Sequence, residues 1–600
     1  GDDIRRSGAR SLPEALRLAP GVQVARIDGG TWAIGMRGFA DRLARSMLVL
    51  IDGRAVYDPL FAGTYWETQD TLLADVDRIE VIRGPGGTLW GSNAVNGIVN
   101  IITKPAARTQ GLDATLGGGS RNHGFASARY GAAAGADWDY RIYGKVFDRG
   151  GGFHADGREY DGLRMGQGGF RADWTPPGAR RFTLQGDVYS GRLGRRTTTT
   201  SFTPPFSRTE DGDAPLAGGN LLARWNGPFA GLGRFQLQTF YARTSRDERP
   251  VAETRDTFDV DFQQTPGRWG RHQLTWGTGF RVTSGRIRAV APTAFLPDRR
   301  TDHLVTAFVQ DEIAIRPDRL RLTLGSKVGH NDYSGVEFQP GVRMAWTPNA
   351  DHTLWGAVTR AVRIPSRVET DYTTTSLVTP AGPVFVRLEP NPDFRPEQVL
   401  AYEAGYRIRP AAPLYVSVAA FYDTLDDVLS TEVFPAVLEP ADAPARVVVP
   451  VSFGNGLAGQ SRGVELSADL RATDWWRWTA NYSYVRIDVS KQPGSRDGAS
   501  EQRDEGLTPR HQAQLQSSLD LPRGWTLDLL VRAISELAQP AIPGYVAADV
   551  RLGWHVRPRL ELAFVAQDLG ADPWHVEWPG SGGAGVGIRR SGYVELIWRQ

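Results

Sequence analysis

The chain has 600 residues, and its 69 Lys and Arg residues nearly balance its 67 Asp and Glu residues, which argues against a nucleic-acid-binding protein with its concentrated basic patch. The absence of cysteine excludes disulfides, thiolate metal sites and a cysteine nucleophile. No apolar run approaches the ~18–20 residues that a transmembrane helix needs, which excludes a helical membrane protein.

The first ~105 residues predict a small α/β unit, because a helix signal is followed by several short apolar runs. Ser11 suits an N-cap, with Pro13 in the first turn and Glu14 three residues after the serine. The helix is expected to run through Leu18 and to end at Pro20-Gly21. Strands are expected at residues 21–27, 47–51, 79–82 and 98–102.

From about Gly111 onward, apolar and polar residues alternate along segments of about ten residues. One such set places five side chains on one face of a strand: Trp525, Leu527, Leu529, Val531 and Ala533. A large secreted β-protein shows the same alternation, so it stays an alternative at this point. The number of segments, their length and the aromatic residues at their ends favour a membrane barrel. At roughly 22 residues per strand and connection, this region predicts about 22 antiparallel strands, a barrel size that needs a plug.

The connections between these segments have unequal lengths. Arg557-Pro558-Arg559 reads as a short turn, whereas long polar loops are expected at residues 192–213, 371–391, 435–450 and 492–505. Short turns on one side and long loops on the other are typical of outer-membrane barrels. The last expected strand, residues 592–598, places Val594, Leu596 and Trp598 on one face.

Four motifs in the first unit carry a more specific pattern: GMRGF at 35–39, MLVLIDGR at 47–54, DRIEVIRGP at 77–85 and WGSNAVNGIVNIITK at 90–104. In this order they resemble the plug of TonB-dependent outer-membrane receptors. Segments 359–366, 395–406, 461–466 and 507–511 resemble barrel motifs of the same family. The resemblance covers nearly the entire chain. It implies a mostly β fold, with an α/β plug at residues 1–107 inside a 22-stranded antiparallel transmembrane β-barrel at residues 108–600.

One departure from the family concerns the C-terminus. A last strand that ends on an aromatic residue resembles the assembly signal of outer-membrane barrels, but here Arg599 and Gln600 follow Trp598.

The resemblance also assigns four charged residues to the docking of the plug. Arg37 and Arg83 lie in the two arginine-glycine motifs of the plug, and Glu403 and Glu465 lie in barrel motifs. The resemblance implies that these four hold the plug against the barrel wall. The alternative is that both arginines only satisfy carbonyl groups of the plug. Such ion pairs contribute about 0–1 kcal/mol each when exposed and more when they are shielded.

By the same resemblance, the ligand rests on plug loops 26–31, 41–45, 56–66 and 88–90. The candidate ligand contacts are Arg26, Asp28, Tyr57, Phe61, Tyr65, Trp66 and Trp90. The four aromatic residues of loop 56–66 suit the flat or apolar face of a ligand. Alternatively they pack against the lumen wall, and about half of them are expected to face the ligand side.

Arginines in the long loops mildly favour an anionic ferric siderophore, because the guanidinium fork suits carboxylates and catecholates: Arg192, Arg195, Arg196, Arg299 and Arg300. Loop arginines also suit the phosphates of lipopolysaccharide. His330 and His352 belong to no spaced ligand set, so neither a metal site nor a cofactor is expected.

Two features of the sequence could suggest an enzyme. Glycines 84, 86 and 87 are not followed by a Gly-Lys-Ser/Thr sequence, so a phosphate-binding P-loop is not supported. Asp426 with Asp427, or Glu501 with Asp504, would be the carboxylate pairs of a secreted hydrolase. Because no arrangement of a nucleophile and a base stands out, no enzyme activity is expected.

The resemblance therefore implies a monomer in bacterial outer-membrane lipid and lipopolysaccharide that takes up a scarce solute with energy delivered by TonB. A ferric siderophore is the first candidate, with a cobalamin-like or oligosaccharide solute as the alternative. A passive porin would need no folded N-terminal unit. TonB is expected to bind a short segment before Gly1, and the chain opens without a signal segment, which we expect to have been removed.

Overall fold

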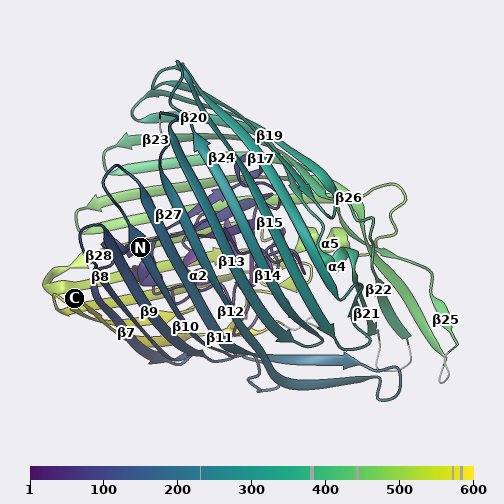
Figure 1. Cartoon of the computed structure of the whole chain (residues 1–600). Helices are drawn as coiled ribbons and strands as arrows, with labels where there is room; N and C mark the ends of the chain where they lie inside the picture. The colour runs from purple at the N-terminus through teal and green to yellow at the C-terminus, as the bar shows by residue number, and fades with distance from the viewer. Residues whose placement is uncertain (230, 379–383, 441–444, 571–572, 581–584) are drawn as a thin grey trace.

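The computed structural model describes residues 1–600 except 230, 379–383, 441–444, 571–572 and 581–584. Long tilted strands form a barrel, and the N-terminal part of the chain lies inside it (Figure 1). Both chain ends lie toward one end of the barrel, and the hairpins that carry β22 and β25 project from the other. Across the described residues, no helix is long and apolar enough to cross a membrane.

The plug combines short helices with two small sheets. Ser11 caps helix α2 by accepting a hydrogen bond from the Glu14 N–H, but the helix ends at Leu16 and not at Leu18. A β1–β2 hairpin lies beside a four-stranded sheet of order β4-β3-β6-β5. The elements are α1 Asp2–Arg6, α2 Leu12–Leu16, β1 Val22–Arg26, β2 Trp32–Met36, β3 Met47–Ile51, β4 Arg54–Ala55, η1 Leu73–Asp75, β5 Val76–Arg83, α3 Gly87–Trp90, β6 Gly97–Thr103 and η2 Ala106–Arg108.

Apolar runs without alternation form the centre of the plug sheet. Strand β3 is buried along its whole length and pairs in parallel with β6. A strand covered on both faces needs apolar side chains on both, which explains the continuous run in its sequence. By contrast, β5 is longer than the expected 79–82, because it is an edge strand that also carries polar residues such as Arg78.

Within the described residues, 22 strands form the wall, and β36 closes it by pairing with β7. They are β7 Gly111–Gly119, β8 Asn122–Ala133, β9 Trp138–Arg149, β10 Leu163–Trp174, β11 Arg181–Thr200, β12 Ser207–Pro228, β13 Arg234–Glu248, β14 Val251–Thr265, β15 His272–Ala289, β17 Arg299–Arg316, β18 Leu320–Asn331, β19 Gly335–Asn349, β20 His352–Arg363, β23 Glu397–Ala411, β24 Leu414–Val433, β26 Arg446–Thr473, β27 Trp476–Lys491, β28 His511–Leu521, β29 Trp525–Ile534, β32 Tyr545–Arg557, β33 Leu560–Gln567 and β36 Ser591–Arg599.

Short elements lie in the connections between these wall strands. They are β16 Ala294–Phe295, α4 Arg367–Thr370, β21 Tyr372–Leu377, β22 Val384–Glu389, β25 Val437–Glu439, α5 Ser500–Gly506, η3 Pro522–Gly524, β30 Leu537–Ala538, β31 Ala541–Ile542, β34 Trp574–Val576 and β35 Gly587–Arg589.

Strand β36 shows how the alternation sorts side chains between the two faces of the wall. Val594, Leu596 and Trp598 are 42–43% exposed, as expected for an outer face, which would contact lipid. Glu595 between them is 4% exposed and accepts a hydrogen bond from Arg10 of the plug. The polar residues of this strand therefore face the plug.

Tryptophans mark the short-turn end of the wall. Trp138 stacks on Trp174, and Trp525 stacks on Trp554 with ring centroids 5.2 Å apart. Other exposed tryptophans lie close to strand ends: Trp225, Trp276, Trp346, Trp475 and Trp598. Such a girdle is typical of a membrane–water interface.

The prediction of a loop at residues 192–213 is wrong for most of these residues. Strand β11 continues to Thr200 and β12 starts at Ser207, and the two stay paired up to Thr200 opposite Ser207. Polar residues can continue a strand there, because beyond the membrane both faces of a hairpin contact water. Stretches 371–391, 435–450 and 492–505 likewise contain β21 and β22, β25, and α5, although residues 379–383 and 441–444 lie outside the described residues.

Candidate functional site

The four predicted docking residues meet where the plug faces strands β23 and β26. Arg37 follows β2 in a left-handed conformation, with φ of 54°. Its Nη2 lies 2.8 Å from Glu403 Oε1 and its Nε lies 3.7 Å from Glu465 Oε1. Arg83, at the end of β5, places Nη1 3.2 Å from Glu465 Oε2. The structure thus brings all four into one cluster of plug cations and wall carboxylates.

This cluster is shielded from water and closely packed. The Arg37 side chain is 2% exposed, and its guanidinium lies 4.2 Å from the centre of the Phe421 ring. Burial lowers the pKa of Arg37, but Glu465 and Glu403 outweigh that effect and raise it above its ordinary value. A side chain on Gly84 would come within 2.4 Å of both Arg37 and Glu403, which explains the glycine of the second motif.

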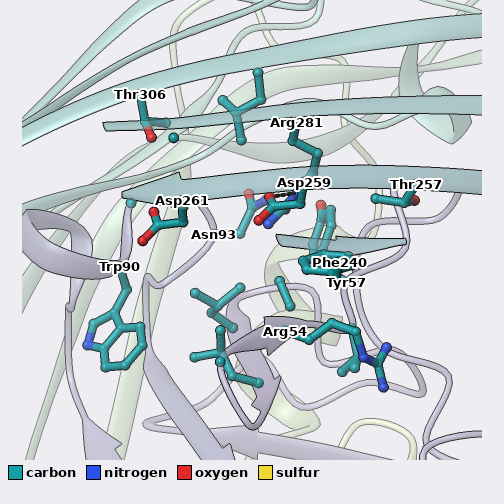
Figure 2. A pocket seen from close by; sticks show the side chains of 18 of the residues that line it. Arg54, Tyr57, Trp90, Asn93, Phe240, Thr257, Asp259, Asp261, Arg281 and Thr306 are labelled. Carbon is teal, nitrogen blue, oxygen red and sulfur yellow. Dashed lines mark hydrogen bonds and ion pairs between the residues drawn. The ribbon is translucent and has the colours of Figure 1, made fainter. Parts of the chain in front are cut away.

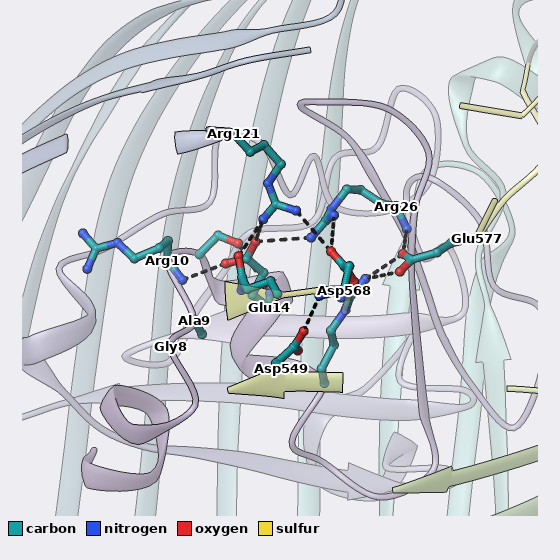
Figure 3. Close-up of polar contacts among 12 residues, drawn as sticks. Gly8, Ala9, Arg10, Glu14, Arg26, Arg121, Asp549, Asp568 and Glu577 are labelled. Carbon is teal, nitrogen blue, oxygen red and sulfur yellow. Dashed lines mark hydrogen bonds and ion pairs between the residues drawn. The ribbon is translucent and has the colours of Figure 1, made fainter. Parts of the chain in front are cut away.

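A second charge cluster, which the sequence did not reveal, joins the plug to Arg121 just before β8 and to Asp568 just after β33 (Figure 3). Glu14 accepts a 2.6 Å hydrogen bond from Arg121 and a 2.7 Å bond from the Arg10 backbone. Asp568 lies 3.3 Å from Arg26. Burial raises the pKa of Glu14, but Arg121, Arg149 and Arg26 outweigh that effect and lower it to about 2.

Glu577 extends the second cluster on the loop side. It is 3% exposed, pairs with Arg17 at 2.6 Å and accepts a 2.7 Å hydrogen bond from the Arg26 backbone. Asp568, His575 and Glu577 each offer a ligand atom within 4.8 Å of the others. Since arginines already neutralise both carboxylates, we assign these residues to the charge cluster and not to a cation site.

Three arginines near the N-terminus of the plug each bind a carboxylate on a different wall strand. Arg5 lies 2.7 Å from Glu561 of β33, and Arg6 lies 2.8 Å from Asp528 of β29. Arg10 lies 2.9 Å from Glu595 of β36. The sequence shows these arginines, but nothing local indicates their partners more than 500 positions away.

Three of the predicted ligand contacts are buried. Trp66 is 2% exposed and belongs to the hydrophobic core of the plug. Arg26 is 3% exposed within the second charge cluster. Asp28 accepts a hydrogen bond from the backbone N–H of Gly30 and forms an ion pair with the loop residue Arg195 at 2.6 Å. In this structure these three offer little surface to a ligand from outside.

The other four predicted contacts are less buried, and they have different neighbours. Phe61 packs edge-on against Phe295 and Tyr372 of the extracellular connections, with ring centroids 6.0 and 6.2 Å away. Tyr65 lies beneath Arg42 and Arg246. Tyr57 and Trp90 line a cavity between the plug and the wall.

That cavity has a volume of about 620 Å³ and is shown in Figure 2. Its plug side includes Arg54, Tyr57 and Trp90, and its wall side includes Asp259 and Arg281, which are joined by a 2.9 Å hydrogen bond. Small-molecule sites commonly measure about 300–1,000 Å³. Loop residues Arg196 and Arg300 do not line the cavity, although Arg300 pairs with Asp302, which does.

Family models match both parts of the chain. The TonB-dependent Receptor Plug Domain matches residues 1–98, and the TonB dependent receptor-like beta-barrel matches residues 106–569.

Curated relatives include the iron-regulated outer membrane virulence protein of Vibrio cholerae, 23% identical over 81% of this chain and 74% of the relative. The ferric enterobactin receptor of Pseudomonas aeruginosa is 24% identical over 61% of this chain and 58% of its own. The vitamin B12 transporter BtuB of Vibrio cholerae is 35% identical, over 22% of this chain and 21% of its own.

Among solved structures, the siderophore receptor PirA from Acinetobacter baumannii superposes with a TM-score of 0.80 at 15% identity, covering 100% of this chain and 97% of that one. The FrpB iron transporter from Neisseria meningitidis gives a TM-score of 0.78 at 12% identity, with coverages of 99% and 97%. At these identities the likeness shows the fold. Because the family models match plug and barrel in turn, the chain is an outer-membrane protein of the TonB-dependent receptor family.

Proposed function

We propose that this receptor takes up a ferric siderophore across the outer membrane by TonB-coupled active transport. The observation that carries the proposal is the plug inside the barrel, tied to several wall strands by shielded ion pairs. Such a plug must be moved before a large solute can pass, which requires work. A passive porin would instead hold an open aqueous channel.

The iron class of the solute is supported by the relatives. Three of the proteins named above are called an iron-regulated outer membrane protein, a ferric enterobactin receptor and a siderophore receptor. The match to the vitamin B12 transporter makes a cobalamin the second candidate, but it covers only 22% of this chain.

For the first contacts of the ligand we retain Tyr57, Phe61, Tyr65 and Trp90, whose side chains are only partly buried. Their rings offer flat faces for an aromatic or apolar part of the solute. We also keep Arg37, Arg83, Glu403 and Glu465 as the docking cluster. In this proposal the plug comprises residues 1–107 and the barrel comprises residues 108–600.

The remaining parts of the proposal concern partners. TonB couples to the plug, and lipid and lipopolysaccharide surround a monomeric barrel. The protein has no catalytic role, and neither a cofactor nor a resident metal takes part in transport.

Growth of a deletion strain carrying the gene on a plasmid tests the function. The panel contains iron-loaded catecholate and hydroxamate siderophores, cobalamin and oligosaccharides, each with and without TonB. We expect TonB-dependent growth on at least one ferric siderophore. TonB-dependent rescue by cobalamin or an oligosaccharide alone would reject the iron proposal, and rescue without TonB would reject coupling.

A further inference from the structure

The cavity beside the plug extends along much of the barrel height. Gln236 and Gln263 line it near the ends of β13 and β14 that meet the short turns. Asp302, near the start of β17, and Tyr333, after β18, line it near the extracellular connections. Apart from Ile364, which follows β20, its other lining residues come from the plug and from the wall strands between β12 and β18.

Beside this cavity and along its edge, wall side chains bind backbone carbonyls of the plug. Gln238 donates a 3.0 Å hydrogen bond to the Gly53 carbonyl, and Lys327 donates a 3.2 Å bond to the Leu89 carbonyl. Arg343 donates a 3.3 Å bond to the Pro85 carbonyl. Lys327 and Arg343 are charged donors, whereas the bond of Gln238 joins two neutral groups and is about half as strong as a charge-assisted one.

Other wall segments hold the plug through paired ions. The pairs of Arg6 with Asp528, Arg10 with Glu595 and Arg37 with Glu403 are 2.8–2.9 Å long. Removing one partner of such a buried pair is strongly destabilising, because the other charge is left buried and unpaired. Strands β13 and β14 on the cavity side also pair with the plug, Arg246 with Glu67, Glu248 with Arg42 and Arg255 with Asp58, and pairs beside the passing solute would have to open.

The plug segments beside the cavity are small units that can shift without dismantling the core. Helix α3 is a single turn, Gly87–Trp90, and β4 has two residues. Asp52 and Gly53 join β3 to β4 in a tight turn, with φ of 49° and 78°. Two successive residues with positive φ make the tight turn that two-residue hairpins favour, so the turn keeps its own geometry together with its short strand.

We propose that the solute passes between the plug and wall strands β12–β18, and that the cavity is an interior site which it occupies in transit. In this step α3 and the β3–β4 turn move away from the wall while the sides held by Arg6, Arg10 and Arg37 stay docked. The inference rests on the proposed function. The lining offers Arg54 and Lys327 as donors, Asp261 as an acceptor, and the rings of Tyr57 and Trp90, which suits a polar solute with flat aromatic groups.

Paired cysteines can test this route, because the chain has none of its own. A side chain on Gly325 of β18 would lie 2.7 Å from Thr88 Cγ2, so Thr88→Cys with Gly325→Cys tethers α3 to the wall. The control is Gly30→Cys with Leu163→Cys, which tethers the β1–β2 turn to β10 across a Cβ–Cβ distance of 3.4 Å. Disulfides commonly span Cβ–Cβ distances of about 3.5–4.5 Å.

Uptake is measured with ⁵⁵Fe-loaded siderophore, using the complex that supports growth in the panel above. The oxidised 88–325 tether is expected to keep binding but to lose uptake, which returns with dithiothreitol. The oxidised 30–163 tether is expected to keep both. Uptake through the oxidised 88–325 tether, or equal loss in both tethers, would overturn the side-specific route.

A second measurement needs neither solute nor TonB. Purified protein in a planar bilayer is exposed to rising urea until the plug loosens and conductance appears. We expect the 88–325 tether to shift this onset to higher urea, and the 30–163 tether to leave it near the wild-type value. An unshifted onset in the 88–325 protein would overturn the inference even if no ferric siderophore proves to be the solute.

Discussion

Arg37 of the plug donates a 2.8 Å hydrogen bond to Glu403 of strand β23, 366 positions further along the chain. Glu465 of β26 lies within 3.7 Å of the same guanidinium and within 3.2 Å of Arg83. One wall carboxylate therefore serves both arginine-glycine motifs. Because the two arginines differ in their number of partners and in burial, substituting them should loosen the plug to different extents.

Arg37→Ala should loosen the plug more than Arg83→Ala, because Arg37 has two carboxylate partners and a side chain that is 2% exposed, against 22% for Arg83. Removing one member of a buried pair costs about 3–5 kcal/mol. The urea midpoint for protease cleavage of the plug measures the effect. Arg321→Ala, at a 55% exposed site, is the control. Equal midpoints for Arg37→Ala and the control would contradict a docking role.

Acid should weaken the second charge cluster through Glu14. The arginines around it lower its pKa from 4.5 to about 2 in the folded protein. Its contribution is therefore complete above pH 4.5 and is lost as the pH falls from 4.5 toward 2, by roughly 3 kcal/mol. Urea midpoints of plug release should fall with pH in this window in the wild type and change less in Glu14→Gln. Glu80→Gln, at an exposed plug site, should keep the wild-type slope.

Phe61→Ala should loosen the extracellular connections that hold β16 and β21. It removes two edge-on ring contacts, with Phe295 and Tyr372, each worth about 0.5–1.5 kcal/mol beyond burial. Hydrogen exchange should become faster in Ala294–Phe295 and Tyr372–Leu377. The control is Leu438→Ala, which also removes an apolar side chain but at a 66% exposed position. It should leave hydrogen exchange in these two segments unchanged. Unchanged exchange in Phe61→Ala would argue against this contact.

A lysine on the outer face should destabilise the barrel in a depth-dependent way. Val342 of β19 is 46% exposed and lies four residues before Trp346 of the tryptophan girdle. A lysine near the bilayer midplane costs about 2–4 kcal/mol. Val342→Lys should lower the yield of heat-modifiable folded barrel in lipid vesicles. Val437→Lys, on the extracellular strand β25, should not, and equal yields would place Val342 outside the lipid-facing band.

The alternation of apolar and polar residues predicted the strands of the barrel wall, but it did not predict the lengths of the hairpins. In β36 the exposed set of Val594, Leu596 and Trp598 follows directly from the alternation. By contrast, polar residues at 192–213 were expected to form a loop and instead extend β11 and β12. Strand pairing continues there through backbone hydrogen bonds, which have no sequence signature.

Among the charged residues, too, the sequence predicted one cluster and not the other. Motifs predicted the set Arg37, Arg83, Glu403 and Glu465, and all four meet. Nothing in the sequence predicts that Glu14, Asp568 and Glu577 meet in the second cluster. The sequence also does not indicate which aromatic residue of loop 56–66 is buried, and the structure places Trp66 in the plug core. Residue type predicts the chemistry of a side chain, whereas its neighbours depend on how the chain closes.

The sequence by itself determined the family, the period-2 wall and the α/β plug, because each depends on residues close together in the chain. Only the tertiary structure decided which wall residues form ion pairs with the plug and where a cavity of about 620 Å³ lies beside it. The physical reason is closure: pairing β36 with β7 fixes every strand around the lumen, so that Arg10 meets Glu595 across 585 positions.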